Sequence, residues 1–301
     1  MTFAGIRVTP SPGDPNAKAR DHQLDLYGIT HVGNVRKQNQ DHFLLCTVHP
    51  QVVIHGTSLP DAETLPLRGE RLATIMMVAD GVGGGSGGGE ASQLALETIT
   101  RYVASSLRSY HTAGGENEEV FLSALRAAAF EAHRTVRGEA TSRAEAQGLK
   151  EAHGMATTLT LATVVWPWAY VVQVGDSRCY HYFGGKLTQV TRDQTLAQDL
   201  IDKGALPKEA AGASPLSHVL ASAIGGRAAT PEVTRIDMRP RGRVLLLCSD
   251  GLTKHVKDEQ IADELGKMLS SEQLCRDLLE MALAGGGSDN TTVLAGRALP
   301  D

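Results

Sequence analysis

The sequence predicts an α+β fold in which a central sandwich of two antiparallel β-sheets is flanked on both faces by pairs of antiparallel helices. Short apolar runs bounded by turn residues recur along the chain, two long segments before its midpoint repeat apolar residues at helical spacing, and two shorter helical segments follow near its C-terminal end. A sheet and an amphipathic helix each bury an apolar face, so many strands and paired helices favour stacked layers.

The predicted strands are short apolar runs with Gly, Pro or polar residues at their ends, and they cover residues 24–30, 43–47, 75–79, 158–166, 170–174, 178–183, 187–191, 233–238, 243–248 and 291–295. The predicted helices repeat apolar residues every three or four positions, and they cover residues 90–107, 120–136 with a polar continuation toward 149, 258–266 and 271–284. Residues 49–70 are expected to form a surface hairpin or insertion, and residues 196–224 a mixed, partly helical excursion.

A single domain is the favoured organisation. With 301 residues, of which 42% are hydrophobic, the chain could form one large domain or two ordinary ones. No linker divides the stretch from Asp41 to Asp289, which carries the candidate functional residues. We expect residues 1–22, which hold several prolines among polar residues, to form a mobile arm, and residues 23–298 to form the domain.

Charge and composition narrow the class of protein. The formal net charge of −5 argues against nucleic acid as the main partner, because binding a phosphate backbone needs a clustered basic surface. No apolar run approaches the ~20 residues of a membrane span. The four cysteines lack Cys-x-x-Cys spacing, which indicates buried free thiols in a reducing compartment and therefore a cytoplasmic protein.

Four aspartates stand at the ends of apolar runs, namely Asp41, Asp80, Asp250 and Asp289. A stiff strand holds such a carboxylate in place while the carboxylate faces solvent. Several carboxylates gathered at one edge repel each other and therefore imply a cation. Oxygen ligands suit Mg²⁺ and Mn²⁺, which often act in pairs and activate a water against a phosphorus centre. The residues alone thus predict a metal-dependent hydrolase.

The glycine-rich tract at residues 81–89 permits two other interpretations. It matches the G-x-G-x-x-G spacing of a dinucleotide site from Gly83, and the G-x-S-x-G spacing of a serine-hydrolase elbow around Ser86. Both patterns arise easily in a tract this rich in glycine, and the first lacks a second parallel strand that ends in an acid. The simpler interpretation is that the glycines let the backbone beside Asp80 curl around a ligand or metal.

Seven motifs occur in the order typical of one family, and they lie at residues 33–41 (GNVRKQNQD), 79–84 (ADGVGG), 154–158 (GMATT), 174–178 (VGDSR), 187–193 (LTQVTRD), 249–252 (SDGL) and 288–292 (SDNTT). Together they resemble the PP2C (PPM) family of metal-dependent protein phosphatases, particularly the bacterial Ser/Thr type, over about residues 23–296. The resemblance implies hydrolysis of phosphoserine and phosphothreonine by direct attack of a metal-activated water at a binuclear Mn²⁺ or Mg²⁺ centre.

The resemblance also implies a role for each site residue. Asp80 would bridge the two ions, with the Gly81 carbonyl on the second ion, and Asp250 and Asp289 would hold the first. Arg36 would bind the substrate phosphate, since its planar fork suits two phosphate oxygens. Asp80 and Arg36 are therefore the expected catalytic residues.

Some positions depart from the family pattern. Gln40 and Asp41 are expected beside the metals, where the family often has Glu-Asp, and the neutral amide of Gln40 should weaken binding of the second ion. His153 stands where bacterial relatives place an Asp that binds a third metal, and imidazole suits Mg²⁺ poorly, which argues against a third ion. Asp176 is expected to hold a turn beneath the site. Asp193 opens the excursion that resembles the family's flap, with a role either in substrate access or in capping.

Two functions of different classes remain open. One is an active Ser/Thr protein phosphatase, a monomer that acts on phosphorylated proteins and opposes a bacterial-type Ser/Thr kinase. The other is a catalytically weak or silent relative that binds phosphoproteins or serves as a regulatory domain. The retained metal ligands and Arg36 favour the enzyme, because a silent relative would be free to lose them.

Overall fold

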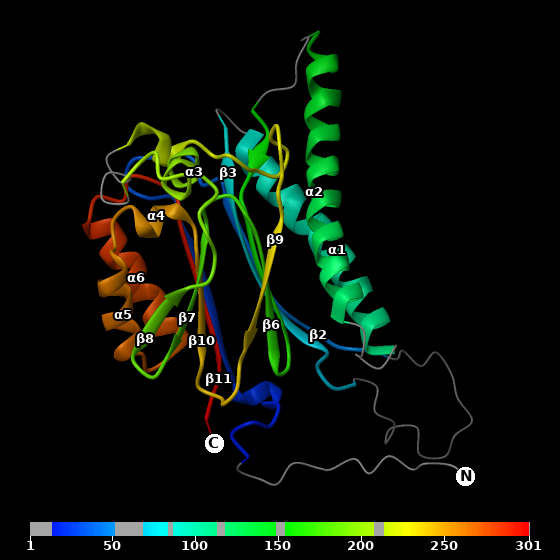
Figure 1. Cartoon of the computed structure of the whole chain (residues 1–301), viewed down its shortest axis with the longest axis vertical. Helices are drawn as coiled ribbons and strands as arrows, with labels where there is room; N and C mark the ends of the chain where they lie inside the picture. The colour runs from blue at the N-terminus through cyan, green and yellow to red at the C-terminus, as the bar shows by residue number, and fades with distance from the viewer. Residues whose placement is uncertain are drawn as a thin grey trace.

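Two antiparallel sheets lie face to face in the middle of the molecule and are covered by helices on both outer faces (Figure 1). Helices α1 (Gly87–Thr112) and α2 (Glu118–Ala146) pack on one sheet, and α5 (Asp258–Gly266) and α6 (Ser271–Ala284) pack on the other. This computed structural model describes residues 14–51, 69–83, 87–112, 118–148, 154–207 and 214–300. The predicted α+β sandwich is confirmed.

The strands of the described residues are β1 (Leu24–His31), β2 (Asp41–Val48), β3 (Ala73–Val82), β4 (Ala156–Thr157), β5 (Leu159–Val165), β6 (Trp168–Val174), β7 (Arg178–Phe183), β8 (Lys186–Gln189), β9 (Glu232–Asp237), β10 (Val244–Cys248) and β11 (Thr291–Ala298). Two shorter helices are α3 (Leu196–Asp202) and α4 (Asp250–Thr253). One sheet has the strand order β1-β11-β10-β7-β8 and the other β2-β3-β5-β6-β9, with β4 paired to β3. Every predicted strand and helix is present.

The central strands bury side chains on both faces, because each sheet packs between a helix layer and the other sheet. In β3, Met76 and Val78 belong to the core between the sheets, whereas Ile75 and Met77 belong to the core shared with α1 and α2. Successive strand residues face opposite sides. A strand buried on both sides is therefore a continuous apolar run that ends abruptly where the sandwich ends, and in β3 Asp80 marks that end.

The described part of the N-terminal segment packs against the sandwich. The carbonyl of Pro15 accepts a 2.9 Å hydrogen bond from the Arg241 N–H, and the carbonyl of Asn16 accepts one of 3.0 Å from the Trp166 indole. Ala19 is only 3% exposed. Residues 15–19 therefore pack on the domain, and the prediction of a mobile arm is wrong for them. Residues 1–13 of that predicted arm lie outside the described residues, and the domain boundary at residue 23 stays a prediction.

The predicted insertion at residues 49–70 closes on itself at its base. The Gly69 N–H donates a 2.9 Å hydrogen bond to the Pro50 carbonyl. Residues 52–68 lie outside the described residues, so the hairpin expected there stays a prediction.

The excursion of residues 196–224 carries α3 and returns to the sandwich beside the end of β3. The backbones of Ile224 and Thr157 exchange two hydrogen bonds of 2.9 Å. Thr157 in turn pairs with Gly81 of β3. The returning end of the excursion is therefore anchored next to the predicted metal ligands.

None of the helices in the described part of the chain combines the length and the apolar composition that crossing a membrane requires. All four cysteines are free thiols, and three of them, Cys179, Cys248 and Cys275, are buried. The prediction of buried free thiols is confirmed for these three.

Candidate functional site

The four candidate aspartates meet at one end of the sandwich. Asp41 begins β2 and pairs in register with Asp80, near the end of β3. Asp250 follows β10 and Asp289 precedes β11, and these two strands are neighbours in the other sheet. Each sheet therefore contributes two carboxylates. A cleft of about 1180 Å³ opens beside them, and both Asp250 and Asp289 line it.

Asp41 lies at the base of the site and connects the two sheets. Its side chain is buried, and its Oδ2 accepts 2.7 Å hydrogen bonds from the hydroxyls of Ser249 and Thr292. Ser249 directly precedes Asp250, and Thr292 lies in β11. These bonds hold the end of β2 against the ends of β10 and β11, so the carboxylates of the two sheets keep a constant spacing.

The end of β3 that carries Asp80 is held from both sides. The Asp80 N–H donates to Thr158 Oγ1 at 3.0 Å, and the Thr158 N–H donates to the Asp80 carbonyl at 2.9 Å. Gly81 has no room for a side chain, since a Cβ there would lie 2.3 Å from the Gly88 carbonyl oxygen and 2.7 Å from that of Gln40. Only glycine lets the first turn of α1 pack this closely on the strand.

Two cationic side chains hold Asp250 and Asp289. The Lys254 ammonium lies 2.6 Å from Asp250 Oδ2 and 2.7 Å from Asp289 Oδ2. The Arg36 guanidinium, from the β1–β2 loop, also contacts Asp289, with Nε 2.8 Å from Oδ1 and Nη2 2.9 Å from Oδ2. The sequence reasoning missed Lys254, which its spacing of four residues after Asp250 could have signalled.

Burial, together with the neighbouring carboxylates, disfavours the charged forms of Asp80 and Asp41. Burial raises the pKa of Asp80 well above its usual range, and the charges of Asp41 and Asp250 raise it further. Burial likewise raises the pKa of Asp41 to about 6, against two hydroxyl hydrogen bonds that lower it. Burial alone would also raise the pKa of Asp289, but hydrogen bonds from its two cationic partners hold it below the usual value.

The donor set fits a divalent cation. Among the described residues, Asp41 Oδ1 and Asp250 Oδ1 are buried oxygens without a hydrogen-bond partner. Carboxylate oxygens are the ligands that Mn²⁺ and Mg²⁺ prefer, and a cation would relieve the repulsion that raises the pKa of Asp80. In the part of the chain that the structure describes, no three acidic, His or Cys side chains are already placed to share one ion. Lys254 occupies Oδ2 of Asp250, and Lys254 and Arg36 together occupy both oxygens of Asp289, so an ion that used these atoms would displace a cationic side chain.

Gln40 lies next to Gly81. The Gln40 carbonyl accepts hydrogen bonds from the Gly81 N–H at 3.2 Å and from Ser92 Oγ at 2.6 Å. These contacts use the backbone of Gln40, so the role of its side chain toward a second metal stays a prediction. His153 lies outside the described residues, and the argument against a third ion also stays a prediction.

Asn290 is a site residue that the sequence reasoning did not single out. Its side-chain amide donates 2.9 Å hydrogen bonds to the carbonyls of Val32 and Gln38. Asn290 thus fastens the loop that contains Arg36 to the turn that contains Asp289. The position of Asn290 in the SDNTT motif could have indicated a role in the site. Its hydrogen-bond partners lie some 250 residues away in sequence, so only the fold reveals them.

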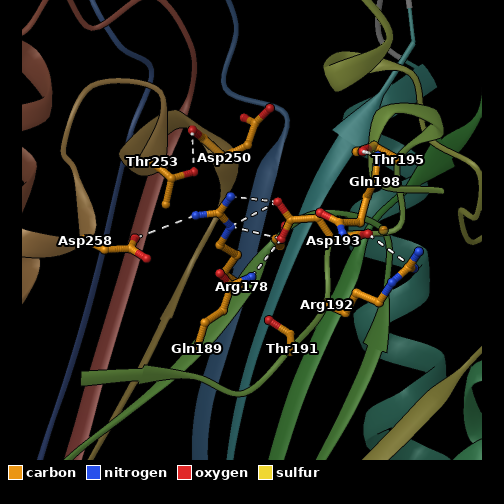
Figure 2. Close-up of polar contacts among 12 residues, drawn as sticks. Arg178, Gln189, Thr191, Arg192, Asp193, Thr195, Gln198, Asp250, Thr253 and Asp258 are labelled. Carbon is orange, nitrogen blue, oxygen red and sulfur yellow. Dashed lines mark hydrogen bonds and ion pairs between the residues drawn. The ribbon is translucent and has the colours of Figure 1, made fainter. Parts of the chain in front are cut away.

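The cleft continues toward α3, where charged side chains pair with one another (Figure 2). Arg178 of β7 binds Asp193, with Nη2 2.7 Å from Oδ2, and lies 3.7 Å from Asp258. Arg192 binds Asp199 of α3 at 2.9 Å. Arg178 and Arg192 on this wall therefore each have an acidic partner.

Asp193 was predicted either to cap a helix or to shape substrate access, and the structure excludes the first role. Thr195 Oγ1 accepts a 3.2 Å hydrogen bond from the Gln198 N–H and so caps α3, which excludes capping by Asp193. Asp193 lines the cleft and pairs with Arg178, and its role in substrate access stays a prediction.

Asp176 lies in the turn between β6 and β7, as predicted. Burial and neighbouring acidic charges raise the pKa of Asp176 to about 7.

The two alternative motifs of the glycine-rich tract both include residues 84–86, which lie outside the described residues. β3 lies between the antiparallel neighbours β2 and β5. A dinucleotide-binding motif belongs to a parallel sheet, so that interpretation is wrong. The close packing at Gly81 instead agrees with the simpler interpretation of the glycines.

The sequence is similar to those of known proteins. Residues 61–284 match the family model described as Protein phosphatase 2C. The serine/threonine protein phosphatase PstP of Mycobacterium tuberculosis is 34% identical over 222 residues, which are 74% of this chain and 40% of that protein. The serine/threonine phosphatase stp of Listeria welshimeri is 31% identical over 228 residues, which are 73% of this chain and 82% of that protein.

The likeness extends to solved structures. The catalytic domain of PstP in complex with 2 manganese ions superposes with a TM-score of 0.66 at 28% identity, over 92% of this chain and 98% of that one. The alignment with the M. tuberculosis PstP sequences spans only 40% of their length, so the likeness concerns one part of those proteins.

Proposed function

Because this chain belongs to the protein phosphatase 2C family, we propose that it hydrolyses phosphoserine and phosphothreonine in proteins, with two Mn²⁺ or Mg²⁺ ions as cofactors. The observation that carries the proposal is that carboxylates from both sheets meet beside one cleft, which the Arg36 guanidinium also lines. Cation ligands and a phosphate-binding group are the components that hydrolysis at a binuclear centre needs. A relative whose solved structure holds 2 manganese ions supports the choice of metal.

The residues that would hold the ions are the predicted oxygen donors, namely Asp80, the Gly81 carbonyl, Asp250 and Asp289, with Gln40 and Asp41 beside them. When bound, the ions would lower the pKa of a water molecule and balance negative charge on the phosphate oxygens. Arg36 binds and orients the phosphate, because its side chain is 57% exposed and can turn two N–H groups from Asp289 to phosphate oxygens.

The test is release of phosphate from phosphoserine and phosphothreonine peptides with and without Mn²⁺. We expect release that depends on Mn²⁺. A catalytically silent relative would instead bind the peptide without releasing phosphate, so binding without turnover at saturating Mn²⁺ would favour the regulatory function. A serine-directed probe that labels Ser86 and abolishes release would favour the serine hydrolase.

Replacing Arg36 with alanine is expected to raise KM by about tenfold or more, the usual range for losing charge-assisted hydrogen bonds, and to change kcat less. The reason is that the contact with the phosphate already exists in the bound ground state. Arg36→Lys should restore only part of the affinity, since an ammonium lacks the bidentate fork. Steady-state kinetics at saturating Mn²⁺ give both constants.

Arg134→Ala is the matched control, because Arg134 is an exposed arginine on α2 that pairs with Glu131. Its KM should equal that of the unmodified protein. An unchanged KM for both Arg36 variants would place Arg36 outside the phosphate site.

Phosphorylated proteins are the partners that this activity requires, and they include the substrates of a bacterial-type Ser/Thr kinase. We further propose that the chain acts as a monomer in the cytoplasm. The four free cysteines support a reducing compartment.

A further inference from the structure

Lys254 is the one cation of the described residues that contacts both Asp250 and Asp289. Its ammonium uses Oδ2 of each carboxylate, at 2.6 Å and 2.7 Å. These are the two residues assigned to the first metal ion. Oδ1 of Asp250 has no hydrogen-bond partner in the described part of the chain, but a divalent ion held by these two carboxylates would lie close to the ammonium that already contacts their Oδ2 atoms, and like charges at such short distances repel strongly.

The backbone holds Lys254 in this position. Its N–H donates a 2.9 Å hydrogen bond to the Asp250 carbonyl, which continues the short helix α4 for one more residue. Residues four apart on a helix lie on the same face, so the side chain of Lys254 returns to Asp250 without strain. The contact is therefore a consequence of local helix geometry together with the position of Asp289.

Lys254 also has space into which it can move. It lines the same cleft as Thr253 and His255, and its side chain keeps 23% of its exposed area. A lysine side chain is a flexible chain of four carbons that ends in a strongly hydrated ammonium. The ammonium can thus leave the carboxylates and enter the cleft while α4 stays in place.

We propose that Lys254 is an internal cation that competes with the incoming divalent ion for Asp250 and Asp289, and thereby sets the metal concentration at which the site becomes loaded. This inference rests on the metal site of the proposed function. It adds that binding of the first ion is an exchange of one cation for another. At low metal concentration the ammonium would balance the negative charge of these two carboxylates. The same contact would lower the affinity of the site for the divalent ion.

The first experiment is a calorimetric titration of Mn²⁺ into the full chain and into Lys254→Met, which keeps an unbranched side chain of similar shape and removes its charge. We expect Lys254→Met to bind Mn²⁺ with a dissociation constant lower by about tenfold, within the usual range of coupling between two binding events. Lys267→Met is the matched control, because Lys267 pairs with Glu264 on the surface near the end of α5 and does not line the cleft. An equal or higher constant in Lys254→Met overturns the proposal.

A second measurement needs no variant. Amine acylation by a small ester is followed at each lysine of the unmodified protein by mass spectrometry, with and without saturating Mn²⁺. We expect Mn²⁺ to speed acylation of Lys254 several-fold by freeing its amine, and to leave Lys267 unaffected. An identical Lys254 rate in both conditions overturns the proposal.

The two experiments also separate this proposal from the one on which it rests. If Mn²⁺ binds the unmodified protein and phosphopeptides are hydrolysed, but Lys254→Met and the acylation rate show no difference, only the competition is wrong. If Mn²⁺ binds neither protein, the metal-dependent function and the competition are both wrong.

Discussion

Replacing Asp80 or Asp250 with asparagine is expected to lower kcat by about a hundredfold or more, with the fold retained. Each substitution keeps the shape of the side chain and removes the charge that would hold the cations. The contacts that position Asp80 are made by its backbone, through Thr158, so an amide leaves them intact. Steady-state kinetics, circular dichroism and metal content measured by mass spectrometry distinguish loss of catalysis from loss of structure.

Asp277→Asn is the matched control for these variants. Asp277 lies on α6, does not line the cleft and accepts a hydrogen bond from Gln273. Its kcat should be unchanged. Near-normal turnover in Asp80→Asn or Asp250→Asn, together with the metal content of the unmodified protein, would show that the ligand assignment is wrong.

Removal of metal is expected to abolish hydrolysis of p-nitrophenyl phosphate, and added Mn²⁺ or Mg²⁺ to restore it. The candidate ligands are carboxylate and carbonyl oxygens, and the buried thiols of Cys179, Cys248 and Cys275 pack in the cores away from the cleft. Oxygen ligands hold Mg²⁺ and Mn²⁺ without the strong bonds that thiolates form with softer metals. A chelator should therefore extract the ions.

The measurement is turnover before and after exhaustive dialysis against EDTA. EDTA that has been saturated with Mn²⁺ beforehand serves as the control and should not inhibit, which separates chelation from any direct effect of the reagent. Full turnover after complete removal of metal would falsify the metal mechanism.

Local patterns in the sequence were sufficient to predict the fold class and most element positions. The run that ends at Asp80 and the run that precedes Ser249 are apolar at every position, because both faces of a central strand are buried in a four-layer molecule. Helix and strand periods depend on neighbours a few residues away, so the sequence shows them directly. The same runs located the aspartates, since a buried strand ends where polar residues begin.

The partners of those aspartates were decided only by the tertiary structure. Asp41 is hydrogen-bonded by Ser249 and Thr292, and Lys254 contacts Asp289 as well as its local partner Asp250; the contacts of Asp41 and Asp289 depend on which strands are neighbours. The order β1-β11-β10 makes the first and the last of the described strands neighbours. No local period encodes such pairing, because it follows from the packing of whole sheets. The charge around each carboxylate, and with it the pKa of Asp80, therefore becomes defined only when the sheets have assembled.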